Sequence, residues 1–408
     1  MSEEIMVSIL SMLPPKSVMR FKCVRKSWYS LINNSSFIAK HLSNTMCNKH
    51  STSILCKRCV LRDINTDEKE VVCSLISLSS NSNNDEHHIH SVVEDIHIPL
   101  SFGVMTRGQF KGDEVLLAVS IIGHCDGIIC LVASLNIVLW NPAIKEFKIL
   151  PNQCLPNGTL NSMAFGYDPK SKDYKFLNIV DPSEETLGEH RIVYDLPRIE
   201  VYTLSTDSWR EIKTYSLETE TTMFWPMFYQ MYFNGFCYWI GCEKQKDFMD
   251  YFDRDDEEWV RQVIHSFDMS NEVFDHILLP NSLYLYEPLA RYFNMHVILW
   301  NESIALFGLY SIGGPDAYGV WVLNNFGSQE GSWTKLLTLE VILGIEKELV
   351  FWKSDEILMV GKDGRIATYN FKAQTIKYLP IDSMFPENSE AVICVNSIVS
   401  VTPEKQRA

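Results

Sequence analysis

The stretch IVLWNPAIKEFKILP, residues 137–151, decides the fold, because its pattern of a strand, a turn and a second strand recurs along the chain. Clear copies are VYTLSTDSWREI at 201–212 and HSFDMSNEVFDHILLP at 265–280, and weaker copies follow at 320–337 and 366–381. The unit returns every roughly 45 to 65 residues, which is near the spacing of β-propeller blades. Each copy therefore predicts one hairpin of a blade.

A second strand pair, marked by Gly and aromatic residues, precedes many of these copies. Examples are GHCDGIICLV at 123–132, FNGFCYWIG at 233–241 and VFWKSDEILMVGKDG at 350–364. Four strands make a propeller blade, and we expect about six blades. Their predicted ranges are 50–100, 118–151, 160–215, 228–281, 290–340 and 345–381. The last apolar strand, AVICVNSIVSV at 391–401, is expected to pair with the first blade and so remove exposed sheet edges.

The segment before residue 50 follows a helical period instead. Ile5, Ile9 and Met12 recur at three- and four-residue steps, which predicts an amphipathic helix over residues 4–13 that Pro14-Pro15 ends. Ser17 is the expected N-cap of a second helix. Apolar residues at helical spacing predict that helix, a third one, and a fourth after Ser35-Ser36; they are Val18, Phe21, Val24, Trp28, Leu31, Ile32, Phe37, Ile38 and Leu42.

Composition and charge indicate which partners the protein can bind and in which cellular compartment it resides. A formal net charge of -15 over 408 residues repels nucleic acid and favours encounter with a basic protein. Glu3 and Glu4 stand where a signal peptide would be positively charged, and no apolar run of about 18 residues occurs. The eleven cysteines are scattered among apolar neighbours, as buried reduced thiols are; examples are Cys23, Cys125, Cys130, Cys237 and Cys394. We therefore expect a cytoplasmic protein without disulfide bonds or membrane contact.

Residue types that suit metal binding or catalysis occur, but their arrangement argues against both. Cys47-x-x-His50 and Cys56-x-x-Cys59 offer zinc ligands, yet strand alternation in SILCKRCVLRDI sends Cys56 and Cys59 to opposite faces. In GHCDG the adjacent His and Cys point apart for the same reason, which disfavours a nucleophile and base pair. Hydrolase, metalloprotease and phosphate-loop motifs are missing from the sequence. We predict no metal, no cofactor and no catalytic residue.

The stretch LPPKSVMRFKCVRKSWYSLINNSSFIAKHL, residues 13–42, resembles an F-box, because it combines a Pro turn, spaced apolar residues and a Trp. The family usually has Leu-Pro before the first helix, where this chain has Ser2-Glu3-Glu4. The remainder resembles the F-box-associated domain of plants in GHCDGIICL, WNPAIKEFKILP, AFGYDPKSKDYKFLNIV, STDSWRE and SFDMSNEVF. Within that family, STDSWRE and RIATYNFKAQTIKYLPI are most similar to the S-locus F-box proteins of the nightshade family.

The resemblance implies an α+β protein. A small α-helical F-box would occupy residues 1–45, an all-β, propeller-like F-box-associated domain of about six blades would occupy residues 46–401, and 402–408 would be a tail. It also implies a substrate-recognition subunit of an SCF ubiquitin ligase, which binds a Skp-family adaptor and, through it, a cullin. The S-locus similarity implies a role in the pollen tube cytosol, with basic, non-self style ribonucleases as the substrates.

The resemblance assigns adaptor binding to the F-box helices, where helix-in-groove packing needs apolar residues. The expected contacts are Ile5, Ile9, Leu13, Pro14, Ser17, Val18, Phe21, Val24, Trp28 and Leu31. The basic residues around them would face an acidic adaptor or solvent. Forty residues cannot bury much apolar surface alone, which favours docking over a self-contained bundle.

For the substrate, the candidate surface is the acidic run at 253–258 between two blade strands. Loops on a rigid β scaffold tend to carry recognition, and concentrated negative charge attracts a basic target. Its acidic residues are Asp253, Asp255, Asp256, Glu257 and Glu258. Two alternatives stay open: a propeller enzyme with paired carboxylates at its channel, and an F-box scaffold that binds the adaptor outside a cullin ligase.

Overall fold

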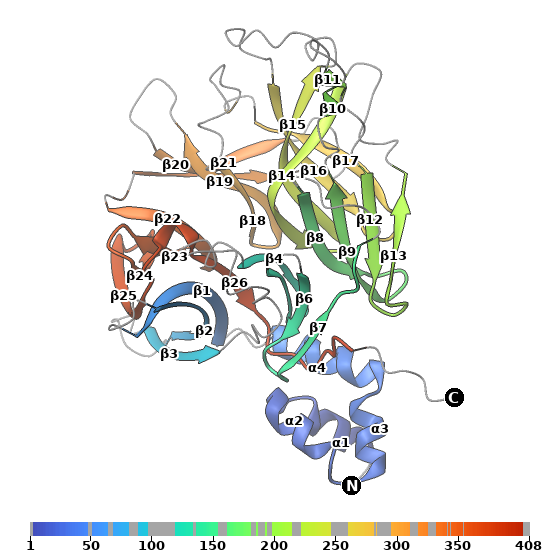
Figure 1. Ribbon diagram of the computed structural model, residues 1–408. Helices are drawn as coiled ribbons and strands as arrows, with labels where there is room; N and C mark the ends of the chain where they lie inside the picture. The colour runs from blue at the N-terminus through green and yellow to red at the C-terminus, as the bar shows by residue number, and fades with distance from the viewer. Residues whose placement is uncertain are drawn as a thin grey trace. The chain divides into compact units, whose positions relative to one another are not determined.

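The computed structural model forms two compact units, Met1–Leu150 with Leu343–Ala408, and Pro151–Ile342 (Figure 1). The residues that it describes are 3–47, 51–63, 68–80, 89–96, 119–133, 136–153, 161–180, 185–186, 192–193, 198–213, 222–245, 260–280, 283, 295–310, 317–324, 332–340, 342, 344–353 and 355–402. Among these residues, no helix is long and apolar enough to cross a membrane.

The first unit opens with four short helices, which we call the helical domain. They are α1 (Glu3–Leu10), α2 (Pro15–Phe21), α3 (Lys26–Ile32) and α4 (Ser35–Cys47). The fourth helix exists as predicted, but it begins at Ser35 and not after Ser35-Ser36. The Asn34 side-chain oxygen accepts a hydrogen bond of 2.8 Å from the backbone N–H of Ser36 and so supports this earlier start.

The prediction that Ser17 caps the second helix is wrong. Pro14 occupies the N-cap position and α2 begins at Pro15, so Ser17 lies inside the helix. Proline suits the first helical position, because its missing N–H would be unpaired there in any case. The first helix is also shorter than predicted, since α1 ends at Leu10.

Three four-stranded antiparallel sheets complete the first unit, and each is one blade. Blade 1 has the strand order β26-β1-β2-β3, blade 2 has β4-β5-β6-β7, and blade 6 has β22-β23-β24-β25. Blade 1 contains β1 (Ser51–Asp63), β2 (Glu68–Ser80), β3 (Ile89–Ile96) and β26 (Glu390–Cys394). Blade 2 contains β4 (Val119–Cys125), β5 (Ile128–Ala133), β6 (Asn136–Asn141) and β7 (Glu146–Ile149). Blade 6 contains β22 (Ile345–Lys353), β23 (Glu356–Gly361), β24 (Arg365–Asn370) and β25 (Thr375–Asp382).

The second unit holds blades 3, 4 and 5, with strand orders β13-β12-β9-β8, β14-β15-β16-β17 and β18-β19-β20-β21. Blade 3 contains β8 (Asn161–Asp168), β9 (Asp173–Val180), β12 (Arg198–Thr203) and β13 (Ser208–Ile212); β10 (Glu185–Thr186) and β11 (Ile192–Val193) form a separate pair. Blade 4 contains β14 (Thr222–Phe233), β15 (Phe236–Gln245), β16 (Val260–Asp268) and β17 (Val273–Leu278). Blade 5 contains β18 (Met295–Trp300), β19 (Ser303–Tyr310), β20 (Ala317–Leu323) and β21 (Trp333–Glu340). The described residues thus form the six predicted blades.

A recurring turn explains why the sequence repeat is visible. In four hairpins a side-chain oxygen of Asn or Asp accepts a hydrogen bond from the backbone N–H two residues further on, at 2.8 to 3.0 Å. These residues are Asn141, Asp168, Asp268 and Asn370. The same turns end at a residue with positive φ, at Lys145, Lys172, Glu272 and Gln374. Asn and Asp are favoured at such positions because their side chains complete the turn locally.

The last strand of the chain belongs to the first blade, as predicted. β26 pairs with β1 in an antiparallel register that runs from Ser53 opposite Cys394 to Lys57 opposite Glu390. The strand ends at Cys394, whereas the prediction extended it to residue 401. The first strand and the last strand that the structure describes therefore lie side by side in one sheet.

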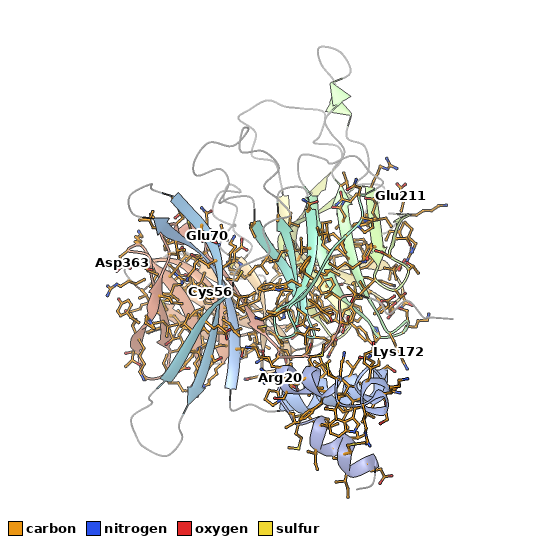
Figure 2. The ribbon with its side chains drawn as sticks, turned by 60° about the horizontal axis from the view of Figure 1, so that its bottom comes forward. Arg20, Cys56, Glu70, Lys172, Glu211 and Asp363 are labelled. Carbon is orange, nitrogen blue, oxygen red and sulfur yellow. The ribbon has the colours of Figure 1, made fainter. Side chains whose placement is uncertain are left out.

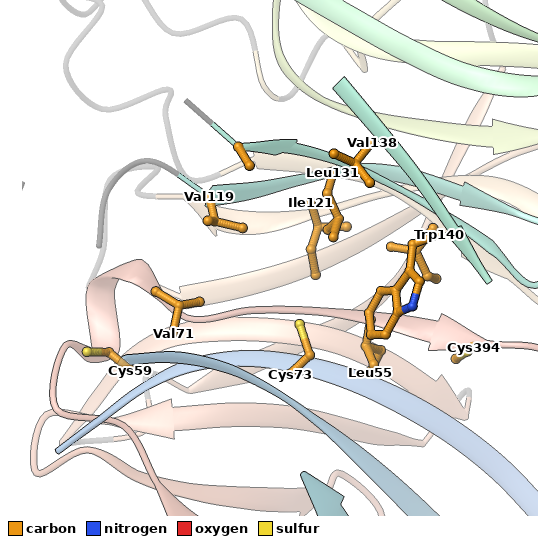
Figure 3. Close-up of a cluster of buried hydrophobic side chains, with 12 residues drawn as sticks. Leu55, Cys59, Val71, Cys73, Val119, Ile121, Leu131, Val138, Trp140 and Cys394 are labelled. Carbon is orange, nitrogen blue, oxygen red and sulfur yellow. The ribbon is translucent and has the colours of Figure 1, made fainter. Parts of the chain in front are cut away.

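The core of the first unit lies between consecutive blades. One cluster joins Leu55, Cys59 and Cys73 of blade 1 to Leu131 and Trp140 of blade 2 (Figure 3). A second cluster joins the other face of blade 1, including Ile54 and Cys56, to blade 6. Cys56 and Cys59 thus lie on opposite faces of β1, as strand alternation predicts, and Figure 2 labels Cys56 within this sheet.

Nine cysteines have described side chains, and all nine are free thiols. Seven are buried, and burial raises the pKa of Cys56 to about 12, so that this group stays protonated at neutral pH. Cys23 was expected to be buried and is exposed, because it lies in the turn after α2 ends at Phe21.

Two adjacent cations of β1 link blade 1 to its two neighbours in the unit. Lys57 Nζ lies 3.0 Å from Glu390 Oε1 of β26 and donates to the Val119 carbonyl oxygen of blade 2 at 2.6 Å. Arg58, on the other face, makes two contacts of 3.0 Å with the Asp95 carboxylate and donates to the Asp382 carbonyl oxygen of blade 6 at 2.9 Å. Both cations are nearly fully buried, so each is held by its anion and by backbone oxygens.

Replacing Lys57 with Met should lower the free energy of unfolding by roughly 3 kcal/mol. The reason is that the Glu390 side chain, which is only 15% exposed, loses the cation that pairs with it. Urea unfolding measures this change. The matched control is Lys372→Met, which removes an 80% exposed lysine 3.4 Å from Asp355 in the same unit and should cost at most about 1 kcal/mol. Equal losses of unfolding free energy in the two variants would contradict the conclusion that the Lys57–Glu390 pair stabilises the contact between β1 and β26.

His265 should make the fold sensitive to acid. It is 1% exposed on β16, and burial, with a smaller contribution from His276, lowers its pKa from 6.5 to about 3. Below pH 6.5 the unfolded chain therefore binds a proton that the native chain does not, so stability falls as pH decreases. At about pH 5 the loss is roughly 2 kcal/mol. Denaturant unfolding at pH 7 and pH 5 should show a smaller difference for His265→Gln than for the parent; an identical difference would refute the role.

Candidate functional site

The helical domain is the candidate site, and its fold depends on α4 holding the turn between α1 and α2. His41 donates from Nε2 to the Leu13 carbonyl oxygen at 2.9 Å. Asn44 Nδ2 donates to the carbonyl oxygen of Ser11 at 3.2 Å and to its hydroxyl at 2.9 Å. Burial lowers the pKa of His41, and the Leu13 contact opposes this only in part, so the ring is neutral at pH 7. These bonds fix where α1 ends and α2 begins.

One face of the helices builds a small apolar core. Leu10, Val18, Ile32 and Phe37 are its buried members from the helical domain, and each is at most 3% exposed. Partly buried residues of the domain that pack against them are Met6, Val7, Leu13, Phe21, Trp28, Leu31 and Ile38. Each helix contributes, so the core fixes the positions of all four.

The other face of α1 is apolar and lies at the surface. Ile5 and Ile9 of α1 lie one helical turn apart and are 53% and 50% exposed, and Met12, in the turn that follows α1, is 78% exposed. We call these three residues the α1 stripe. Val24 and Tyr29 add further exposed apolar surface on the segment that includes α3. Exposed apolar rows of this kind on a small domain mark interaction surfaces.

The predicted adaptor contacts divide into three groups. Ile5, Ile9, Pro14 and Val24 are exposed. Leu13, Ser17, Phe21, Trp28 and Leu31 are half-buried, so each presents part of its surface. Val18 has no exposed surface, and it supports the helical core instead of offering a contact. Met12 and Tyr29 are exposed although they were not among the predicted contacts; the three-residue step from Ile9 to Met12 is the signal that identifies Met12.

Trp28 is held edge-on by its neighbours. Its ring and that of Phe21 are T-shaped, with centroids 5.3 Å apart, and the Arg25 guanidinium lies 5.4 Å from the Trp28 centroid. Arg25 is one of the basic residues around the apolar surface, with Lys16, Arg20, Lys22 and Lys26. All of these except the half-buried Lys22 are exposed, and Figure 2 labels Arg20 on the helices. Exposed positive charge is therefore concentrated on the segment from α2 to the start of α3, in an acidic chain, and Lys16 of this group lies 3.8 Å from Glu94 of blade 1.

The other sequence candidates are placed less completely. The acidic run with Asp253, Asp255, Asp256, Glu257 and Glu258 lies outside the described residues. So does His50 of the zinc candidate, while Cys47 is exposed at the end of α4. Within the part of the chain that the structure describes, no group of three or more His, Cys, Asp or Glu side chains is placed to hold a metal ion.

The fold and this site define a class of protein: a small helical domain with exposed apolar residues, joined to a six-bladed β-propeller. Family comparisons agree with both parts. The F-box domain model matches residues 1–40, and the model described as the F-box associated beta propeller domain matches residues 75–393. The chain belongs to the F-box proteins that carry an F-box-associated β-propeller domain.

Similar curated proteins come from Arabidopsis thaliana. A putative F-box protein is 26% identical over 378 residues, covering 88% of each chain. An F-box/kelch-repeat protein is 24% identical over 404 residues, covering 97% of this chain and 94% of its own. Another putative F-box protein is 23% identical over 352 residues, covering 84% of this chain and 79% of its own. The likeness therefore spans both the helical domain and the propeller.

Proposed function

We propose that the chain is the substrate-recognition subunit of an SCF-type ubiquitin ligase and that it performs no chemistry itself. The helical domain binds a Skp-family adaptor, which joins the chain to a cullin, and the propeller binds the protein substrate. Ubiquitin transfer is then promoted by proximity, because a substrate lysine is held near the activated ubiquitin. Membership of the F-box family supports this role, since an F-box implies an adaptor partner in general.

The observation that carries the proposal is the α1 stripe. Burying an exposed row of Ile5, Ile9 and Met12 against a partner removes apolar surface from water, which stabilises a complex. We propose these residues as the centre of the adaptor contact. Pro14, Val24 and the exposed parts of Leu13, Phe21 and Trp28 extend it. The exposed basic residues of the helical domain suit an acidic adaptor, with charge acting on the rate of encounter.

For the substrate we propose a basic protein, and more narrowly the style ribonucleases recognised by a pollen-side S-locus factor in the pollen tube cytosol. Two observations support this narrower assignment. STDSWRE at 205–211 and the stretch at 365–381 resemble S-locus F-box proteins, and the chain has a formal net charge of -15. The acidic run at 253–258 is the proposed attachment for positive charge on the substrate.

A double variant of the α1 stripe tests the docking proposal. Ile9→Ser with Met12→Ser should reduce recovery of the adaptor and the cullin by at least about tenfold, because each side chain loses apolar contact in the complex. Co-purification with tagged full-length chain measures this recovery.

Met46→Ser is the matched control for this experiment, because Met46 is also 50% exposed but lies near the end of α4. It should leave recovery unchanged. Undiminished cullin in the double variant would exclude the α1 stripe as the docking surface. Adaptor recovered from the parent chain without cullin would instead favour the scaffold alternative.

Neutralising the acidic run tests the substrate proposal. The combined variant should flatten the dependence of ribonuclease affinity on salt, because fewer screened charge pairs then contribute. Its substitutions are Asp253→Asn, Asp255→Asn, Asp256→Asn, Glu257→Gln and Glu258→Gln. The control replaces Asp275, Glu302 and Glu340 by their amides, since these acids are exposed in the same unit. The control variant should keep the salt dependence of the parent. If the variant of the acidic run also kept it, the proposed attachment of the substrate to this run would be wrong.

A further inference from the structure

Residues 395–401 follow β26 and run from blade 1 to the helical domain; we call them the C-terminal strap. Although they are not a strand, Ser397, Ile398, Val399 and Val401 are all at most 7% exposed. An irregular segment buried to this degree must place its backbone polar groups with partners. Its contacts show which parts of the unit it joins.

Asn141, at the end of β6, makes three of the polar contacts of the strap. This side chain has no exposed surface, and its Nδ2 donates to the Val399 carbonyl oxygen at 2.8 Å and to the Ser397 carbonyl oxygen at 3.3 Å. Its Oδ1 meanwhile accepts from the backbone N–H of Ala143 at 3.0 Å, within the β6–β7 turn. One carboxamide therefore completes a blade 2 turn and holds the strap against it.

The β4–β5 turn of blade 2 holds the strap from a second side. Ser397 Oγ donates to the Asp126 carbonyl oxygen at 2.5 Å. Gly127 has a φ of +85°, and a Cβ at this position would lie 2.4 Å from the Val395 carbonyl oxygen and 2.6 Å from Ser397 Oγ. The strap thus passes so close to the turn that only glycine fits.

The apolar side of the strap enters the core of the helical domain. Ile398 is 3% exposed and belongs to the cluster of Leu10, Val18, Ile32 and Phe37. Ile144, from the same β6–β7 turn that Asn141 begins, packs against this cluster. Among the described residues, these are the two side chains of the cluster that come from outside residues 3–47.

We propose that the C-terminal strap is the joint that fixes the orientation of the helical domain on blade 2, with Ile398 and Asn141 as its positioning residues. Asn141 ties the strap to the blade, and Ile398 carries that position into the helical core. In a substrate receptor, this joint sets the distance and direction from the adaptor to the substrate. The effect on ubiquitin transfer rests on the proposed function, whereas the existence of the joint does not.

A distance measurement tests the joint directly. Spin labels are placed on Cys47, which is exposed at the end of α4, and on Lys372→Cys, an exposed position of blade 6 in the same unit. Cys23, Cys154 and Cys242 are replaced by Ser to avoid other labelling. The parent should give one narrow distance distribution by pulsed electron resonance, and Ile398→Ser should widen it at least about twofold, because the helical core loses its strap contact.

The matched control is Val399→Ser, because Val399 is buried in the same strap but is not part of the helical cluster. The distance distribution of Val399→Ser should stay as narrow as that of the parent. Asn141→Ala should broaden the distribution as Ile398→Ser does. Ile398→Ala provides the same comparison with a smaller change if the Ser variant does not fold. A narrow distribution in both Ile398 variants, or equal broadening in Val399→Ser, would overturn the assignment.

Two further readouts separate the joint from the proposed function. In Ile398→Ser, adaptor recovery should match the parent while transfer of ubiquitin to a bound substrate falls about tenfold, since positioning is lost without loss of docking. Failure of the parent to bind any adaptor would refute the proposed function and leave the distance result valid. Unchanged transfer alongside a broadened distance would restrict the joint to a structural role and overturn its role in positioning.

Discussion

The pairing of β26 with β1 is the constraint on which the first unit depends. Blade 1 has its four strands only because residues 390–394 return from the far end of the sequence and lie beside Ser53 to Lys57. The Lys57–Glu390 pair lies at this seam, with side chains 5% and 15% exposed, and Glu390 also accepts a hydrogen bond of 2.6 Å from the backbone N–H of Ile121 in blade 2. The Glu390 carboxylate therefore stabilises both the pairing of β26 with β1 and the contact between blade 1 and blade 2.

The same pairing brings the helical domain and the C-terminal strap together. α4 leads into β1, and β26 leads into the strap, so neighbouring strands deliver both segments to the same end of the sheet. The strap then needs only four residues beyond Cys394 to place Ile398 in the helical core. A helical domain near the N-terminus is thus completed by the last residues of the fold, through a contact that local sequence does not encode.

Patterns with a local physical cause could be read from the sequence. The blades were predictable because the same Asx turn, at Asn141, Asp268 and Asn370, recurs between alternating strands. The opposite faces of Cys56 and Cys59 followed from strand alternation alone. Ser17 misled because its residue type suits an N-cap, while Pro14-Pro15 had already begun the helix. Cys23 misled because apolar neighbours in sequence do not bury a residue that lies in a turn.

The docking surface was only partly predictable, since periodicity identifies an apolar face but not what covers it. Val18 and Ile9 both fit helical stripes, yet Val18 is fully buried and Ile9 is half-exposed. The difference arises because a helical domain this small has too few residues to bury apolar surface on both of its sides. Ile398 and Ile144 cover the side that faces blade 2, so the core forms there. The α1 stripe is then left at the surface. One side of the helical domain therefore attaches it to the propeller, and the other side stays exposed for a partner.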